Sequence, residues 1–281
     1  MVHLSKLIFV IVDALGYDAA TAKAGYLEHM VEAGLAAKYR VRGELPAVSR
    51  PMYETLLTGL PVCRHLVTSN DTVRPSKEAN LFSLTKENGL INAAAAYMWM
   101  WELYGAAKEE LPFQLFRDRI HINEQKSSLM NGIFYGADEY PDSHLFADGE
   151  YLRRTVHPDF LMIHSMQVDY QGHRFGACSA EYENAIVGVT DCMAQLVPAW
   201  LEDGYDVVVT GDHGMDTLHQ HCGNTELQRY VPLYIISNRV TAGYHTNEVS
   251  MLEIAPLLCR LLCIKPSQEM STDQNIRGIN V

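Results

Sequence analysis

Short runs of apolar residues recur along the chain, and two of them lead into an aspartate. Residues 6–12 are followed by Asp13, and the β-branched run at 206–210 leads to Asp212. A strand buried on both faces of a parallel sheet gives such a run, whereas a half-exposed strand alternates apolar and polar residues. The pattern therefore predicts an α/β fold on a parallel sheet. Further strands are expected over 35–41, 91–97, 158–164 and 231–237.

Between these runs, apolar residues recur at helical spacing. The clearest predicted helix covers 181–201, and its repeating face is assigned to the core: Tyr182, Ile186, Val189, Met193, Leu196, Val197 and Trp200. A terminal helix is expected over 251–262. Shorter helices are expected over 25–34, 51–59 and 76–88.

Residues 98–157 are the least regular segment and hold many aromatic side chains. We expect one domain over 1–281 in which this segment forms a helical excursion and loops that overhang the strand ends, as an insertion or lid. Its aromatic residues are expected to pack locally more than to contact substrate: Trp99, Trp101, Tyr104, Phe113, Phe116, Tyr135, Tyr140 and Phe146.

The charge balance narrows the set of partners. A net charge of −12 argues against binding a nucleic-acid polymer, which needs basic patches. It allows a small phosphorylated substrate, because bound cations can reverse the local sign.

Six cysteines without a CxxC pair are expected to be reduced core residues of a cytoplasmic protein. The apolar run at 6–12 is too short to span a bilayer and is not expected to be a signal peptide, so no membrane association is predicted.

Carboxylate and imidazole side chains gather after the predicted strands. Asp212 and His213 follow one strand, Asp13 follows another, and His221 lies in the next loop. Open α/β sheets bind ligands at the carboxyl ends of their strands. These donor types suit zinc or manganese better than calcium.

A second pair, Asp169 and His173, lies a few residues past the strand at 158–164. The pair could face one way on a helix, but Gly172 favours a loop that turns both side chains to one ion. Simpler interpretations stay open: a helix cap for Asp13, and surface or incidental roles for the others. His245, in a predicted turn at 242–246, is a weaker alternative to His221.

Ser49 precedes Pro51 and is expected at a helix N-terminus, where free N–H groups favour an anion. By itself such a serine is usually an N-cap. A nearby metal would lower the pKa of its hydroxyl and make it a nucleophile. The neighbouring Arg50 is expected to face solvent, and Asn70 lies in a polar loop.

The strand-end residues divide into two ligand sets. One set is Asp169, His173 and His221; the other is Asp13, Asp212, His213 and the Ser49 hydroxyl. Two cations about 3.5–4 Å apart can clamp the attacking and leaving oxygens of an in-line phosphoryl displacement.

Four motifs resemble the type I phosphodiesterase/nucleotide pyrophosphatase branch of the alkaline phosphatase superfamily: VDALGYD, PAVSRPMYETLLTGLPVCRH, PDFLMIHSMQVDYQGHRFG and GDHGMDTLHQHCGNTE. The last two are also similar to phosphoethanolamine transferases. The resemblance implies a three-layer α/β fold with a mostly parallel sheet and helices on both faces. It also implies a two-metal centre with the ligand sets above, and Ser49 as nucleophile.

The chain departs from this family at two positions. Met52 stands where diesterases commonly carry an asparagine that contacts the phosphoryl oxygen, and Cys222 replaces a frequent glycine. Sulfatases share the frame around Ser49, but Met52 and Tyr53 replace their serine-arginine pair, which argues against sulfate-ester cleavage.

We therefore expect a metal-dependent phosphoric ester hydrolase with two divalent ions, zinc or manganese, that works through a phosphoseryl intermediate on Ser49. Arg50, Met52 and Asn70 are candidate substrate contacts. A phosphomutase of the same superfamily and a non-catalytic metal-dependent binder are the alternatives.

Overall fold

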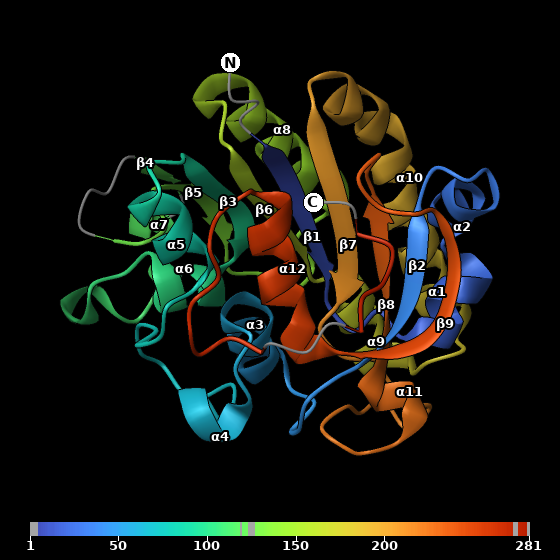
Figure 1. The fold of residues 1–281 in the computed structure, drawn as a ribbon. Helices are drawn as coiled ribbons and strands as arrows, with labels where there is room; N and C mark the ends of the chain where they lie inside the picture. The colour runs from blue at the N-terminus through green and yellow to red at the C-terminus, as the bar shows by residue number, and fades with distance from the viewer. Residues whose placement is uncertain (1–4, 119, 123–126, 272–274, 280–281) are drawn as a thin grey trace.

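The computed structural model describes residues 5–118, 120–122, 127–271 and 275–279. Within these ranges, nine strands form one sheet in the order β4-β5-β3-β6-β1-β7-β8-β2-β9 (Figure 1). The strands are β1 (Lys6–Val12), β2 (Ala37–Arg42), β3 (Asn92–Tyr97), β4 (Ile120–Ile122), β5 (Asn131–Tyr135), β6 (Phe160–Ser165), β7 (Tyr205–Gly211), β8 (Tyr230–Ile236) and β9 (Gly243–Ser250).

The sheet is mostly parallel, as predicted. Strands β5, β3, β6, β1 and β7 run side by side in one direction. Strand β8 is antiparallel to both β7 and β2, and β4 is antiparallel to β5 at one edge. The carboxyl ends of the parallel strands therefore lie at one edge of the molecule, the lower edge in Figure 1.

Helices cover both faces of the sheet and make three layers (Figure 1). One face packs on α1 (Tyr17–Lys23), α2 (Gly25–Glu32), α8 (Asp142–Val156), α9 (Gln167–Phe175) and α10 (Ala180–Glu202). The other packs on α3 (Ser49–Thr58), α5 (Leu81–Glu87), α6 (Met98–Tyr104) and α12 (Ile254–Leu261). The short helices are α4 (Val62–His65), α7 (Leu115–Asp118) and α11 (Glu226–Arg229).

Strand β1 shows why its sequence is an unbroken apolar run. Leu7, Phe9 and Ile11 belong to the core on one face of the sheet, while Ile8 and Val10 belong to the core on the other. Successive side chains of a strand point to opposite faces, so a central strand must be apolar at every position.

Three predicted elements differ in the structure. The helix expected from residue 76 begins at Leu81, because the Asn80 side chain accepts from the N–H groups of Phe82 and Ser83 and caps it there. The turn expected at 242–246 is part of β9. The helix expected over 251–262 starts as a 3-10 turn at Met251–Glu253 and continues as α12.

The prediction of a loop at 167–173 is also wrong, because these residues lie in helix α9. Gly172 does not break this helix. Its bare Cα lets Met215 pack closely, since a Cβ built there would lie 2.8 Å from Met215 Cε. Glycine is required here because Met215 packs close to its Cα, and not because the chain turns.

The segment 98–157 is more regular than expected. It supplies strands β4 and β5 to the sheet and α8 to one helical layer. The alanines of β3 accommodate α8, whose Gly149 would bring a Cβ to 2.8 Å from Ile163 Cδ1 and 3.9 Å from Ala95 Cβ. A lid role for the remainder of the segment stays a prediction.

All six cysteines are free, but only Cys259 is fully buried. The prediction that they are core residues is wrong for the exposed Cys63, Cys178, Cys222 and Cys263. Three of these have positive φ angles in the turns or bends between regular elements. None of the described helices is long and apolar enough to cross a bilayer.

Candidate metal centre

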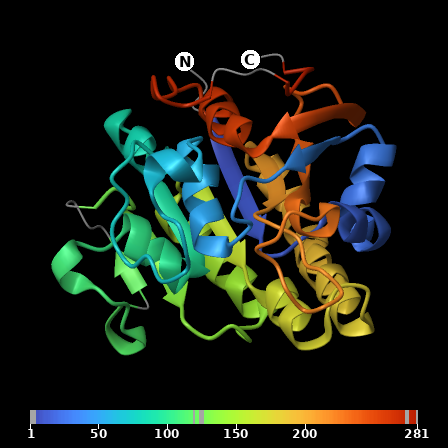
Figure 2. The same ribbon diagram turned by 90° about the horizontal axis from the view of Figure 1, so that it is seen from below.

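The candidate site lies at the carboxyl ends of β6, β1 and β7, at the edge that faces the viewer in Figure 2. These three strands are adjacent and in register, with Val12 opposite Ser165 on one side and Gly211 on the other. Residues that follow the three strands are therefore brought together although they lie far apart in the chain.

Two groups of side chains could each hold a metal ion among the described residues. They are Asp13, Asp212 and His213, and Asp169, His213 and His221; within each group the ligand atoms lie within 4.8 Å of one another. His213 belongs to both groups. Its Nε2 lies 3.4 Å from both Asp13 Oδ1 and Asp212 Oδ2.

His173 lies beside the second group. Its Nε2 is 3.1 Å from His221 Nε2 and 3.4 Å from Asp169 Oδ2. The structure thus brings together the residues of both predicted ligand sets, and it adds that His213 stands between the two.

Each carboxylate in the site has one oxygen without a partner. Asp13 Oδ1, Asp169 Oδ1 and Asp212 Oδ2 are buried and have no hydrogen-bond partner among the described residues. By contrast, Asp212 Oδ1 accepts from the N–H groups of Ala14 (3.0 Å) and His213 (2.9 Å), and Asp13 Oδ2 accepts from the Tyr53 hydroxyl. Unpaired buried polar atoms are costly, and bound cations would satisfy all three oxygens.

The three histidines of the cluster are also oriented as metal ligands. The Nδ1 atoms of His173, His213 and His221 each lie 3.0 Å from a backbone carbonyl, of His219, Gly214 and Ala47 respectively. A carbonyl only accepts, so Nδ1 carries the proton and the lone pair sits on Nε2, which faces the other ligands. Metal-binding histidines are typically held in this way.

The electrostatics of these side chains also suit a cation site. Burial raises the pKa of Asp169 and Asp212 well above the usual range, and it lowers the pKa of His221 to about 3. Burial also acts to raise the pKa of Asp13, but the imidazoles of His164 and His213 outweigh it and the pKa is lowered. A bound cation would stabilise the ionised carboxylates.

Ser49 is the first residue of α3, and the N-cap is Val48. Ser49 therefore does not cap the helix. Its Oγ lies 3.1 Å from His213 Nε2 and is almost fully buried. The hydroxyl thus points to the ligand cluster from the N-terminus of a ten-residue helix.

The prediction that Arg50 faces solvent is wrong. Its side chain is 1% exposed, pairs with Glu102 at 2.6 Å and lies over the Trp99 ring, with Cζ 4.8 Å from the ring centroid. The positive charge is neutralised inside the protein, because the segment after β3 folds back over the start of α3.

The other two candidate substrate contacts, Met52 and Asn70, lie in different surroundings. Met52 packs in the apolar core under α3, away from the ligand cluster. Asn70 lies beside the helix start, where its Oδ1 accepts from the Arg50 N–H at 3.0 Å. His245 stacks on Tyr39 with ring centroids 4.3 Å apart and belongs to neither ligand group.

Two site residues escaped sequence reasoning. Tyr53 lies one helical turn after Ser49, and this spacing could have indicated it. His164 is the one polar side chain between Phe160 and Ser165 in an apolar strand, and its Nε2 lies 3.3 Å from Asp13 Oδ2.

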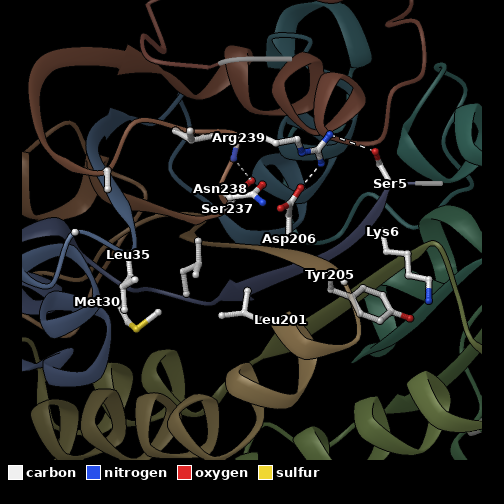
Figure 3. Close-up of a pocket in the computed structure, with 15 residues that line it drawn as sticks. Ser5, Lys6, Met30, Leu35, Leu201, Tyr205, Asp206, Ser237, Asn238 and Arg239 are labelled. Atoms are coloured by element: carbon white, nitrogen blue, oxygen red, sulfur yellow. Dashed lines mark hydrogen bonds and ion pairs between the residues drawn. The ribbon is translucent and has the colours of Figure 1, made fainter. Parts of the chain in front are cut away.

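A cavity of about 800 Å³ lies at the opposite end of β1 and β7 (Figure 3). Its charged groups already have partners: Arg239 pairs with Asp206 and also donates to the Leu261 carbonyl, while Lys6 lies over the Tyr205 ring. The chemistry of the ligand cluster, and not cavity size, identifies the candidate site.

Residues 7–272 match the type I phosphodiesterase/nucleotide pyrophosphatase family. The chain belongs to this family. This family is a branch of the alkaline phosphatase superfamily.

Solved structures share the fold at low sequence identity. Murine ectonucleotide pyrophosphatase/phosphodiesterase 5, as an inactive variant in complex with AMP, matches with a TM-score of 0.74 and 12% identity over 95% of this chain and 97% of that chain. The phosphonate monoester hydrolase of Agrobacterium radiobacter matches with a TM-score of 0.67 and 11% identity, over 98% and 77% of the two chains.

Curated relatives include a GPI ethanolamine phosphate transferase 2 of Candida glabrata, 20% identical over 90% of this chain and 30% of the relative. The catalytic subunit of human GPI ethanolamine phosphate transferase 3 is 30% identical over 37% of this chain and 10% of that protein. The chain spans less than a third of the length of these relatives.

Proposed function

We propose that the protein is a metal-dependent phosphoric ester hydrolase that acts on a phosphorylated small molecule through a phosphoseryl intermediate. The observation that carries the proposal is the set of three buried carboxylates, each with one unpaired oxygen, beside the Ser49 hydroxyl. Such a set is costly in an empty protein and is suited to two cations next to a nucleophile.

Two divalent ions, zinc or manganese, would be held by Asp13, Asp212 and His213 with the Ser49 hydroxyl, and by Asp169, His173 and His221. When bound, they would neutralise phosphate charge and lower the pKa of the serine hydroxyl. Mixed carboxylate and imidazole ligands favour these metals.

The protein's own groups account for the displacement. Ser49 Oγ gives up its proton and forms a bond to phosphorus as the bond from phosphorus to the leaving oxygen breaks, and the leaving oxygen takes up a proton, so the step releases no net proton. Water then displaces Ser49 from phosphorus, which releases the phosphate product and restores the hydroxyl. Two displacements replace one difficult step by two easier ones.

The N-terminus of α3 and Asn70 would hold the phosphoryl oxygens. At the start of α3 the Arg50 N–H donates to Asn70, the Met52 N–H donates to the Val48 carbonyl and Pro51 has no N–H. The helix would therefore act on an anion through its dipole and the Ser49 N–H. Because Asn70 Oδ1 is taken by the Arg50 N–H, its Nδ2 group is the part left to donate to substrate. Arg50 and Met52 do not fit this role, since one is paired with Glu102 and the other lies in the core.

Replacing Ser49 tests the proposal. Ser49→Ala should lower turnover of bis-p-nitrophenyl phosphate at least about 10³-fold, because no covalent intermediate can form. The control is Ser83→Ala, which removes a capping serine of α5 and should leave turnover unchanged while costing about 1 kcal/mol of stability. Unchanged turnover in Ser49→Ala would rule out Ser49 as the nucleophile.

A second candidate is transfer of the phosphoryl group to an alcohol, favoured by the similarity to GPI ethanolamine phosphate transferases. The same intermediate would be released by an alcohol instead of water. Adding glycerol during turnover distinguishes the two activities. A hydrolase releases one phosphate product for each leaving group, whereas a transferase forms glycerol phosphate and releases correspondingly less phosphate product.

A phosphomutase is less favoured. It needs a closing cap to exclude water, and much of 98–157 is built into the sheet and its helical layer.

A further inference from the structure

His164 is a buried histidine at the end of β6 that belongs to neither ligand group. It lies opposite Ile11 in the sheet, two residues before Asp13 on the neighbouring strand. Both ring nitrogens are fully buried and have no hydrogen-bond partner in the described part of the chain. A buried imidazole without hydrogen bonds destabilises the folded protein, so its presence here calls for a role toward a neighbouring residue.

That neighbour is Asp13. His164 Nε2 lies 3.3 Å from Asp13 Oδ2, the oxygen that also accepts from the Tyr53 hydroxyl. The other oxygen, Oδ1, is the unpaired one that faces His213. The two sides of the carboxylate are therefore different: Oδ2 accepts from the Tyr53 hydroxyl and lies against the His164 ring, whereas Oδ1 faces the candidate metal.

The position of His164 is itself well determined. Its ring packs edge-on against the Tyr53 ring, with centroids 4.7 Å apart and planes at 72°. Its backbone carbonyl accepts from the Tyr135 hydroxyl at 2.8 Å. Strand pairing to β1 holds the main chain.

We propose that His164 is a positioning residue that, together with Tyr53, fixes Asp13 so that only Oδ1 is presented to a metal ion. This inference rests on the proposed two-metal centre. With Oδ2 held on one side, the carboxylate cannot turn to bind the ion through both oxygens, and the ligand enters the site with its geometry already set.

His164 is not a second imidazole ligand, beside His213, of the ion that Asp13 would hold. A ligand would have to approach the cation beside Asp13 Oδ1, whereas His164 lies at Oδ2, where Tyr53 already donates. His164 thus differs from His173, His213 and His221, whose Nδ1 atoms are held by carbonyls and whose Nε2 atoms face the cluster.

The test measures zinc binding to the whole chain by metal analysis and by competition with a chelator of known affinity. Wild type should bind two ions. His164→Leu and Tyr53→Phe should each weaken one of the two by roughly 10- to 100-fold, the range typical of groups that orient a metal ligand. His164→Gln keeps an N–H donor near the Nε2 position and should recover part of the affinity.

The matched control is Tyr104→Phe. Tyr104 is also a buried tyrosine that donates to a buried carboxylate, Glu54, at 2.7 Å, but it lies outside the ligand cluster. It should lower thermal stability without changing affinity for either ion. A purely structural role for His164 would give the same result: a lower melting temperature of the metal-free protein, with zinc affinity unchanged.

Wild-type affinity for both ions in His164→Leu, or equal weakening of both ions, would overturn the inference. If His164→Leu does not fold, His164→Gln and Tyr53→Phe carry the same test. Two ions in the wild type with no effect of these variants would refute only the role of His164. A wild type that binds no ion would refute the proposed function, and the inference with it.

Discussion

Two buried charged clusters lie at different places on the sheet, one at the carboxyl ends of β6, β1 and β7 and the other around Lys38 on β2, and they are built in contrasting ways. The metal centre gathers three carboxylates, and each keeps one oxygen without a partner. The cluster around Lys38 on β2 is complete: Lys38 Nζ donates to Glu28 Oε1 at 2.5 Å and to Thr21 Oγ1 at 2.6 Å. The tyrosine rings around it add cation–π contacts, of which Tyr17 is the nearest at 4.6 Å.

The acceptor side of the Lys38 cluster is equally complete. Glu28 also accepts from the hydroxyls of Tyr234 and Tyr244. Burial lowers the pKa of Lys38, and Glu28 partly offsets this effect. Charges that are buried, paired and fully hydrogen-bonded indicate a structural role, whereas buried like charges with unpaired atoms indicate a site suited to a cation.

Removing the metal ions should lower activity more than any other change to the two clusters. Exhaustive chelation should lower turnover at least about 10³-fold, because the three carboxylates are then left without a cation beside the nucleophile. Adding back zinc or manganese should restore activity and raise the melting temperature by linkage. Metal analysis alongside turnover checks this, and full activity in a protein shown to be metal-free would contradict the two-metal proposal.

Breaking the complete cluster should damage stability and not function. Lys38→Met leaves Glu28 without its cation in a mostly buried position and should cost about 3–5 kcal/mol of unfolding free energy. Denaturant unfolding measures this loss. Zinc stoichiometry and turnover of the folded fraction should match wild type; a parallel loss of zinc affinity would show that the two clusters are coupled.

Asp142 offers a smaller and pH-dependent test, since it is a single buried carboxyl with one donor, Ser165, at 2.6 Å. Burial raises its pKa to about 7 from 3.8. Between these values the unfolded chain releases a proton that the folded protein keeps. The stabilising contribution is therefore complete below about pH 4 and is lost as pH rises through 7.

Asp142→Asn should remove this dependence. The variant should gain about 2–3 kcal/mol relative to wild type between pH 5 and pH 8, because it has no proton to lose. The measurement is urea unfolding of both metal-free proteins at the two pH values, in which the carboxylates of the metal centre contribute equally and cancel. A constant difference between the proteins would show that Asp142 is ionised in the fold.

Much of the fold could be predicted from the local pattern of apolar and polar residues. Strands such as β1 and β7 are buried on both faces, so their central residues are mostly apolar, and each apolar run ends where the chain leaves the sheet before Asp13 or Asp212. Elements controlled by a distant neighbour were not readable. Local pattern predicts a loop at Gly172 and an exposed side chain for Arg50, but Met215 packs against Gly172 and Glu102 pairs with Arg50, and both partners lie far away in the sequence.

The sequence by itself determined the donor types, their order along the chain and their place after central strands, because these depend on local composition and strand periodicity. Only the tertiary structure decided which oxygen of each carboxylate is free, that His213 stands between the two ligand groups, and that Tyr53 and His164 lie against Asp13. The orientation of a side chain depends on atoms contributed by other segments, and those segments meet only when the sheet has formed.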